Sequence, residues 1–200
     1  MKKILILFAH PALEKSRVNR ILIKELQKTE RVTFHDLYES YPNFEIDVKY
    51  EQKLLLANDI VVFMHPMFWY STPAILKEWQ DLVLEHRWAY GREGDKLKGK
   101  YFVNFVSTGG KKDAYQSGGF NQHTIRQFLL PIEQTAKLCK MYFLPPFTIS
   151  GTHSIEKAEV EKHKERIHKL IHYLQNDSLD IEETKELDTL NELFEKLVKE

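Results

Sequence analysis

The stretch that decides the fold is Ile60-Val61-Val62-Phe63-Met64-His65-Pro66-Met67-Phe68-Trp69-Tyr70-Ser71-Thr72-Pro73. Residues 60–64 form a continuous apolar run with the length and composition of a buried strand. Thr72 and Pro73 are residue types that begin helices, as the N-cap and in the first turn, so we expect a helix from Thr72 to about residue 85. Aromatic residues thus follow the carboxyl end of a strand, where open α/β sheets bind ligands, and they suit a flat ligand.

Strand-like and helix-like segments alternate along the rest of the chain. Apolar runs predict strands over residues 4–9, 31–36, 59–64, 100–106 and 141–144, with Pro145-Pro146 ending or bending the last. Amphipathic spacing predicts helices over residues 16–28, 49–57, 72–85 (with Leu82 inward), 122–140 (kinked or restarted at Pro131) and 155–175. We therefore expect one α/β domain over residues 1–176, with a five-stranded parallel sheet flanked by helices on both faces. The strand order could be flavodoxin-like or that of half a Rossmann fold.

Residues 177–200 differ in character from the domain before them. A turn-like break at residues 177–180 precedes Leu187, Leu190, Phe194 and Leu197, which recur at heptad-like spacing among Glu and Lys. This pattern predicts an amphipathic C-terminal helix. Its apolar face could pack on its own domain or on a dimer mate, or it could bind another protein; we favour packing, because amphipathic faces usually find a core.

The composition argues against several classes of function. The 200 residues have a formal net charge of zero, with 42% hydrophobic and 29% charged residues, which gives no sign of a nucleic acid or anionic membrane partner. The apolar run at residues 4–9 is too short to span a membrane and is followed by His10-Pro11 rather than a signal cleavage site, so we expect a cytoplasmic location. The single cysteine, Cys139, excludes an internal disulfide and is expected to be a buried structural thiol.

Metal-dependent and hydrolytic chemistry have little support in the sequence. His163, His168 and His172 lie on one predicted helix, but no H-E-x-x-H motif or carboxylate-rich loop accompanies them. We interpret them as part of a solvated helix face and expect no metal. No G-x-S-x-G motif is present, so a Ser/His/Asp hydrolase is not favoured.

Three loops follow the first, third and fourth predicted strands, and their joint placement at one sheet edge is the main functional signal. The first begins at His10-Pro11 and continues to Ser16-Arg17-Val18-Asn19 at a helix start, where free N–H groups suit a phosphate, although Ser16 could be only an N-cap. The second is the aromatic loop, whose rings could instead form a core cluster. The third is Ser107-Thr108-Gly109-Gly110, where glycines let a ligand approach the backbone or simply make a turn. Together the loops predict a site for a planar, phosphorylated cofactor.

These segments resemble the NAD(P)H:quinone oxidoreductase family, and within it the ancillary oxidoreductases of bacterial glutathione-regulated potassium efflux systems. The resemblance runs in order from residue 1 to about residue 175, and the matching segments are residues 5–11, 16–19, 65–77, 88–91, 107–110 and 144–147. It implies a flavodoxin-like homodimer with one flavin per subunit, FMN being favoured over FAD. It also implies ping-pong transfer of a hydride from NAD(P)H through flavin N5 to a quinone.

The resemblance also assigns roles to residues by position. It gives the flavin phosphate and side chain to His10, Ser16, Arg17, Val18 and Asn19, and the isoalloxazine ring to Met67, Phe68, Trp69, Tyr70, Ser107, Thr108, Gly109 and Gly110. Trp69 would flank the ring. Two tyrosines would be catalytic: Tyr90 would line the substrate pocket of the dimer mate, and Tyr115 would help to stabilise charge on the reduced flavin. Some members also use a histidine shortly after that tyrosine, but here the matching stretch is Gly119-Phe120-Asn121 and His123 is displaced.

Two other functions remain open. The chain could be a flavin-holding regulatory subunit of a potassium efflux membrane protein, held at the inner membrane by that partner, and the C-terminal helix could serve the contact. It could also be a one-electron carrier of the flavodoxin type. The loop at residues 10–19 and the neutral charge argue against the carrier, because flavodoxins have a glycine-containing, Thr/Ser-rich phosphate loop and an acidic surface.

Overall fold

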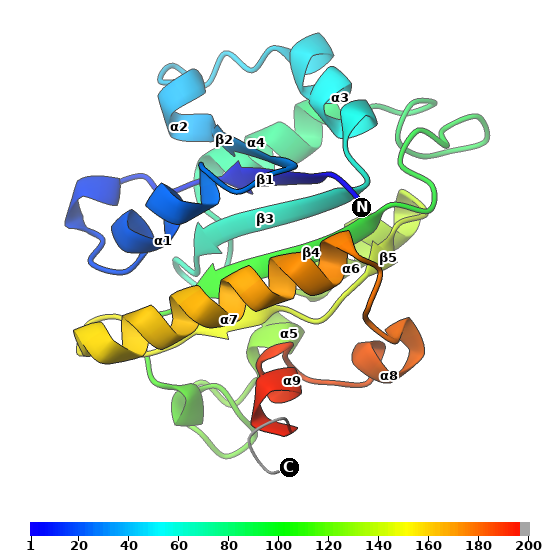
Figure 1. The fold of residues 1–200 in the computed structure, drawn as a ribbon. Helices are drawn as coiled ribbons and strands as arrows, with labels where there is room; N and C mark the ends of the chain where they lie inside the picture. Colours follow the sequence, from blue (N-terminus) through cyan, green and yellow to red (C-terminus); the bar gives the residue numbers. More distant parts are fainter. Residues whose placement is uncertain (197–200) are drawn as a thin grey trace.

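Parallel strands form the centre of the molecule in the order β2-β1-β3-β4-β5, and β6 also pairs with β4 (Figure 1). The computed structural model describes residues 1–196. Its strands are β1 (Ile4–Phe8), β2 (Val32–Asp36), β3 (Ile60–Pro66), β4 (Tyr101–Ser107), β5 (Tyr142–Phe143) and β6 (Phe147–Ile149). This is the flavodoxin-like order, so the expected fold class is confirmed and the half-Rossmann alternative is not.

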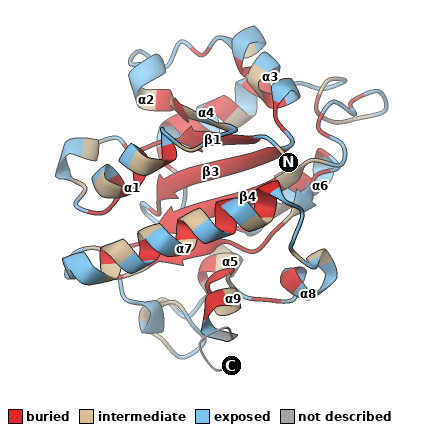
Figure 2. Cartoon of the chain, viewed as in Figure 1, coloured by how far each residue is buried: buried red, intermediate tan, exposed pale blue. Residues whose placement is uncertain are grey.

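Helices cover both faces of the sheet (Figure 2). On one face lie α1 (Asn19–Leu26) and α7 (Lys157–Gln175), whose apolar side chains share one core cluster. The other face is covered by α2 (Leu37–Ser40), α3 (Val48–Ala57), α4 (Ala74–Val83), α5 (Ile125–Phe128) and α6 (Leu130–Leu138). Every residue of β1 and β3 is buried, which is why both strands read as continuous apolar runs, and they hold the loops at their carboxyl ends on a rigid base.

The edge strand is interrupted at Pro145-Pro146 rather than ended there. Phe102 pairs with Phe143 and Phe105 pairs with Phe147, so the edge strand contains one residue more than β4 over this interval. The extra residue is a bulge, and prolines are tolerated at such a place because an edge strand does not need all its N–H groups.

One of two notable helix starts differs from the prediction, and the other agrees with it. Pro73, not Thr72, takes the N-cap position of α4, and Leu82 is 39% exposed while Leu76 is buried in its place. The expected restart near Pro131 is observed, because α5 ends at Phe128 and α6 begins with Pro131 in its first turn.

The expected helical C-terminal extension is present, but it forms two short helices, α8 (Ile181–Lys185) and α9 (Asn191–Lys196). Leu190 and Phe194 join the core beneath α7, so the apolar face packs on its own domain. Leu197 lies outside the described residues. The Asn191 amide accepts hydrogen bonds from Thr148 N (2.8 Å) and Oγ1, and donates one to Thr148 O (2.9 Å). These bonds cover the edge of β6 in the way a neighbouring strand would.

Within residues 1–196, no helix is both long enough and apolar enough to cross a membrane.

Candidate cofactor site

An open cavity of about 980 Å³ lies at the carboxyl edge of the sheet, where the three predicted loops meet. In Figure 1 the arrowheads of β1, β3 and β4 point to this edge, beside the loop that enters α1. The lining residues come from the predicted loops and from the segment after β6: His10, Ala12, Lys15, Ser16, Arg17, Asn19, Pro66, Met67, Phe68, Ser107, Gly109, Thr152 and His153.

Asn19 ties the first loop to the third. Its Nδ2 atom donates to Ser16 Oγ and to Ser107 Oγ, each at 3.1 Å, and both Asn19 and Ser107 are buried. Ser16 Oγ also accepts from the Asn19 backbone N–H at 3.1 Å, which satisfies one donor at the helix start. Ser16 therefore accepts from the first residue of α1, whose N-cap is Val18, and also forms part of the cavity wall.

The first loop presents hydrogen-bond donors and positive charge to the cavity. The backbone N–H groups of Arg17 and Val18 have no hydrogen-bond partner in residues 1–196, and they sit at the N-terminal end of α1, where the helix dipole is positive. The side chains of Lys15 and Arg17 line the cavity. The Val18 side chain is buried in the core, so Val18 contributes only its backbone. This donor set suits an anion such as a phosphate.

His10 lies at the same end of the cavity as a neutral donor. Its Nδ1 atom accepts a hydrogen bond from the Ala12 N–H at 3.2 Å, which leaves the proton on Nε2. Burial lowers the pKa of His10, and the nearby Glu14 only partly opposes this. The ring of Phe68 packs edge-on against the imidazole at 5.8 Å, so the first loop also contacts the aromatic loop.

The aromatic loop is a tight turn with two residues in the left-handed region. Phe68 and Ser71 exchange two backbone hydrogen bonds, and Trp69 (φ 49°) and Tyr70 (φ 63°) lie between them. Turns of this kind normally use Asn and Gly, and a non-glycine residue held there costs about 1–3 kcal/mol. Trp69 is 94% exposed. Phe68 and Tyr70 are also exposed, so the alternative that these rings form a core cluster is wrong; Met67 alone is buried.

Tyr115 lies beside the third loop. Its ring packs so closely on Gly110 that a Cβ atom there would lie 3.1 Å from Tyr115 Cε2. Burial raises the pKa of Tyr115, and the Thr108 and Asn121 side chains oppose this rise. The Asn121 side chain also accepts a hydrogen bond from the Tyr70 hydroxyl at 3.3 Å, which links the aromatic turn to the Tyr115 loop.

Phe128 completes this cluster from α5. It stacks on Tyr70 at 5.0 Å and packs edge-on against Tyr115 at 6.3 Å. His123 packs edge-on against Phe128 at 5.7 Å. Asn121, rather than a histidine, is therefore the polar group that neighbours both tyrosine side chains.

Sequence reasoning missed the segment after β6. Thr152 donates through its N–H and Oγ1 to Thr108 O, which ties this segment to the third loop. His153 covers Gly109, where a Cβ atom would lie 2.3 Å from His153 Nε2, so any larger residue there would have to displace the His153 ring. The prediction stopped at the first, third and fourth strands; applying the same rule to the carboxyl end of the last strand would have found His153.

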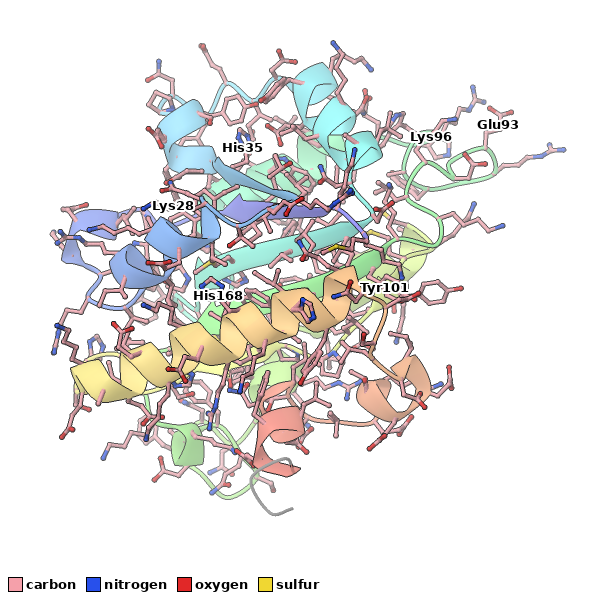
Figure 3. All side chains as sticks on the ribbon, in the orientation of Figure 1. Lys28, His35, Glu93, Lys96, Tyr101 and His168 are labelled. Atoms are coloured by element: carbon pink, nitrogen blue, oxygen red, sulfur yellow. The ribbon has the colours of Figure 1, made fainter. Side chains whose placement is uncertain are left out.

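Tyr90 lies apart from the other candidate residues. The segment that contains it follows α4 at the opposite end of the sheet, where Figure 3 labels Glu93 and Lys96. Tyr90 lines a separate hollow of about 590 Å³ together with residues of α4 and α6, among them Lys77 and Leu138. Within one chain, Tyr90 therefore does not meet the cavity at the carboxyl edge.

No group of three metal-ligating side chains occurs in the part of the chain that the structure describes. His172 is exposed and His168 is partly exposed on α7 (Figure 3), but His163 is buried against Phe147 at 6.1 Å, so it is not part of a solvated face. Cys139 is buried as expected, and burial raises the pKa of its thiol to about 11, which makes it a poor nucleophile.

The fold and this edge define a flavodoxin-like α/β protein with a donor-rich cavity at the carboxyl ends of its strands. Residues 2–171 match the family described as having a flavodoxin-like fold. An uncharacterized NAD(P)H oxidoreductase of Bacillus subtilis strain 168, YrkL, is 46% identical over 165 residues, which cover 82% of this chain and 95% of YrkL. The glutathione-regulated potassium-efflux system ancillary protein KefG of Serratia proteamaculans is 42% identical over 161 residues, or 80% of this chain and 88% of KefG.

Solved structures agree with these relatives. General stress protein 14 of Treponema denticola, in complex with FMN, has a TM-score of 0.78 and 35% identity over 86% of this chain and 97% of its own. An NADPH-quinone reductase from P. pentosaceus has a TM-score of 0.75 and 31% identity over 87% and 96%. The chain belongs to the flavodoxin-like family of NAD(P)H oxidoreductases. Residues 172–200, which include α8 and α9, lie beyond the family match.

Proposed function

We propose that this protein is a flavin-dependent NAD(P)H:quinone oxidoreductase that binds FMN in the cavity at the carboxyl edge. The observation that carries the proposal is the pair of hydrogen bonds by which Asn19 joins Ser16 to Ser107. These bonds hold the donor-rich first loop and the third loop around one cavity, beside an exposed aromatic turn. The FMN complex of one structural neighbour and the quinone reductase name of another support the same assignment.

The residues present suit FMN at both ends of the cavity. At the phosphate end, the free N–H groups of Arg17 and Val18, the cationic side chains of Lys15 and Arg17, and the Nε2–H group of His10 would bind the anion. At the ring end, Phe68 and Trp69 would supply aromatic surface. The backbone N–H groups of Gly109 and Gly110, which have no partner in residues 1–196, would donate to the ring.

FMN, when bound, would supply the acceptor and donor for hydride transfer. The chain would orient the flavin ring and would shield from bulk water the part of the ring that faces the sheet. It would also place hydrogen-bond donors where negative charge develops on the ring. Tyr115 remains a neutral phenol at physiological pH because burial raises its pKa, so it can donate a hydrogen bond at the third loop. Asn121, which is uncharged, would orient the two tyrosines and would not transfer a proton.

We also propose that a second copy of the chain completes the substrate pocket. Tyr90 precedes the start of β4, at the end of the sheet opposite the cavity, so it can reach a cofactor cavity only across a dimer interface. Leu138 at that hollow and Leu130 at the other end of α6 are both exposed and offer apolar surface for such an interface. Sedimentation velocity should then give a dimer; a monomer at micromolar concentration would remove Tyr90 from the site.

The test of the function is cofactor content followed by turnover. Purified protein should be yellow, release FMN on heating, bleach with NADPH and regain its colour with a quinone. Asn19→Ala should weaken FMN binding because it unties the first loop from the third. Asn58→Ala is the matched control, since Asn58 is equally buried but bonds Leu54 O within the α3 region, and it should bind FMN normally.

A second function, as ancillary subunit of a potassium efflux membrane protein, is favoured by the similarity to KefG. Such a protein would act at the inner face of the membrane through its partner. Leu190 and Phe194 of the C-terminal extension are already part of its own core, so the contact would involve another surface. Co-purification of the full chain with the transporter is the expected result, and protein that does not co-purify with it would contradict this second function. A stable one-electron state in a reductive titration would instead favour a flavodoxin-type carrier.

A further inference from the structure

Two polar side chains are buried side by side in the centre of the sheet. His65 on β3 and Asn104 on β4 are both 0% exposed. Asn104 pairs in register with Phe63, and His65 pairs with Val106. Because side chains alternate along a strand and Phe63 and Val106 belong to one core cluster, both polar side chains point toward the face covered by α2–α6.

The pair is incompletely hydrogen-bonded. His65 Nε2 and both polar atoms of the Asn104 amide make no hydrogen bond of normal geometry within residues 1–196, although the Asn104 amide lies close enough to His65 to act on its pKa. His65 Nδ1 lies 3.0 Å from Pro66 O, and since a carbonyl oxygen only accepts, Nδ1 must carry the proton. Burial lowers the pKa of His65 more than Pro66 and Asn104 raise it, so the ring is neutral.

An arrangement of this kind does not favour stability. Unpaired polar atoms in a core are destabilising, whereas two apolar side chains of the same shape are close to neutral or stabilising. The presence of both residues therefore needs a reason other than fold stability. Buried polar groups without hydrogen-bond partners are concentrated at functional sites.

The contact that His65 does make is at the cavity. Pro66 O and Met67 N belong to one peptide group: His65 Nδ1 donates to the oxygen at 3.0 Å, and the N–H donates to Ser107 O at 2.8 Å. Both polar atoms of this peptide are thus held, and Pro66 and Met67 both line the cavity. The strained turn with Trp69 and Tyr70 begins at the next residue, and left-handed non-glycine residues persist only where the surroundings determine the backbone.

We propose that His65, supported by Asn104, is a positioning residue that fixes the Pro66–Met67 peptide and thereby the aromatic turn at the cofactor cavity, at some expense of fold stability. The proposal rests on FMN binding in that cavity. It needs no proton transfer by His65, which acts through the backbone and does not reach the cofactor.

The test uses His65→Phe, Asn104→Leu and the double variant in the full chain. The double variant should unfold at the same or a higher urea concentration than the parent, yet bind FMN about fivefold more weakly, the equivalent of one lost orienting hydrogen bond. In the flavin-free protein, amide hydrogen exchange in residues 66–71 should be at least several-fold faster, with the rest of β3 unchanged. His163→Phe is the matched control, because it removes a buried histidine whose Nδ1 is also unpaired but which does not line the cavity; its FMN affinity should be that of the parent.

A double variant that is clearly less stable would overturn the proposal, because the pair would then serve folding. Unchanged FMN affinity together with unchanged exchange in residues 66–71 would also overturn it. If the parent protein itself takes up no flavin, the proposed function fails, and the exchange experiment still decides whether His65 positions the turn.

Discussion

Replacing Glu51 with Gln should destabilise the fold strongly although the shape of the side chain hardly changes. The Glu51 carboxylate is 0% exposed and accepts three hydrogen bonds: from Tyr41 OH at 2.6 Å, His35 Nε2 at 2.7 Å and Trp79 Nε1 at 2.8 Å. Figure 3 labels His35, a residue of β2, between α2 and α3. One buried carboxylate therefore joins β2, α3, α4 and the residue after α2.

The magnitude follows from the geometry of the three donors. Tyr41 and His35 share one carboxylate oxygen, and Trp79 bonds the other. A glutamine has only one oxygen for these two positions. If that oxygen faces Tyr41 and His35, the NH₂ group faces the Trp79 N–H, which can only donate. If the oxygen faces Trp79, both Tyr41 and His35 must change from donor to acceptor. Hydrogen bonds to charged groups contribute about 1.5–3 kcal/mol each, and a donor left buried without a partner costs a similar amount. We expect a loss of about 3 kcal/mol, which for a chain of this size lowers Tm by roughly 6–12 °C.

Urea and thermal unfolding followed by circular dichroism measure this loss. Glu85→Gln is the matched control, because Glu85 also accepts from a glutamine and a lysine but is exposed to solvent, so its unfolding midpoint should not move measurably. FMN affinity of folded Glu51→Gln should stay near the parent value, since no atom of the network lines the cavity. A Glu51→Gln protein within about 1 kcal/mol of the parent would refute the reasoning that this carboxylate joins the layers.

Three further predictions concern the site. Trp69→Gly should raise stability by up to about 1–3 kcal/mol, because glycine adopts the left-handed conformation at φ 49° without steric cost and the side chain that is lost is 94% exposed, while FMN binding weakens; a loss of stability in urea unfolding would contradict the strain. Gly109→Ala should displace His153, since the new Cβ would lie 2.3 Å from its ring, and flavin titration should then show weaker binding. Gly99→Ala is the control for backbone effects alone, because a Cβ atom at Gly99 meets no atom within 4 Å although its φ is 79°. The pKa of His10 in the folded protein lies below the ordinary value of about 6.5, so the unfolded chain binds more protons as the pH drops. The free energy of unfolding should therefore decrease below about pH 6.5. This decrease should be smaller in His10→Gln when unfolding is measured between about pH 7 and pH 5.

The parts of the fold that depend on local pattern could be predicted. β1 and β3 are buried on both faces, so their apolar runs predict these strands without information from the rest of the chain. The continuation of the sheet beyond Pro145-Pro146 could not be predicted, because it depends on pairing with β4 and not on the prolines themselves. The break between α8 and α9 has the same origin, since Asn191 is held by Thr148, far away in the sequence.

The site shows the same division. The rule that ligands bind at the carboxyl ends of parallel strands brought the loops at Ser16, Trp69 and Ser107 to one edge, and the structure places them there. Spacing could not reveal that His153 covers Gly109, because that contact joins segments that only the folded sheet brings together. Nor could it reveal that His65 holds the peptide before the turn, because this depends on the orientation that the buried ring takes in the folded core.

The most direct test of the central claim is the identity and amount of cofactor in the purified protein. The account predicts close to one FMN per chain, bleached by NADPH and restored by a quinone, with binding weakened in Asn19→Ala and unaffected in Asn58→Ala. Colourless protein that takes up neither FMN nor FAD would contradict it.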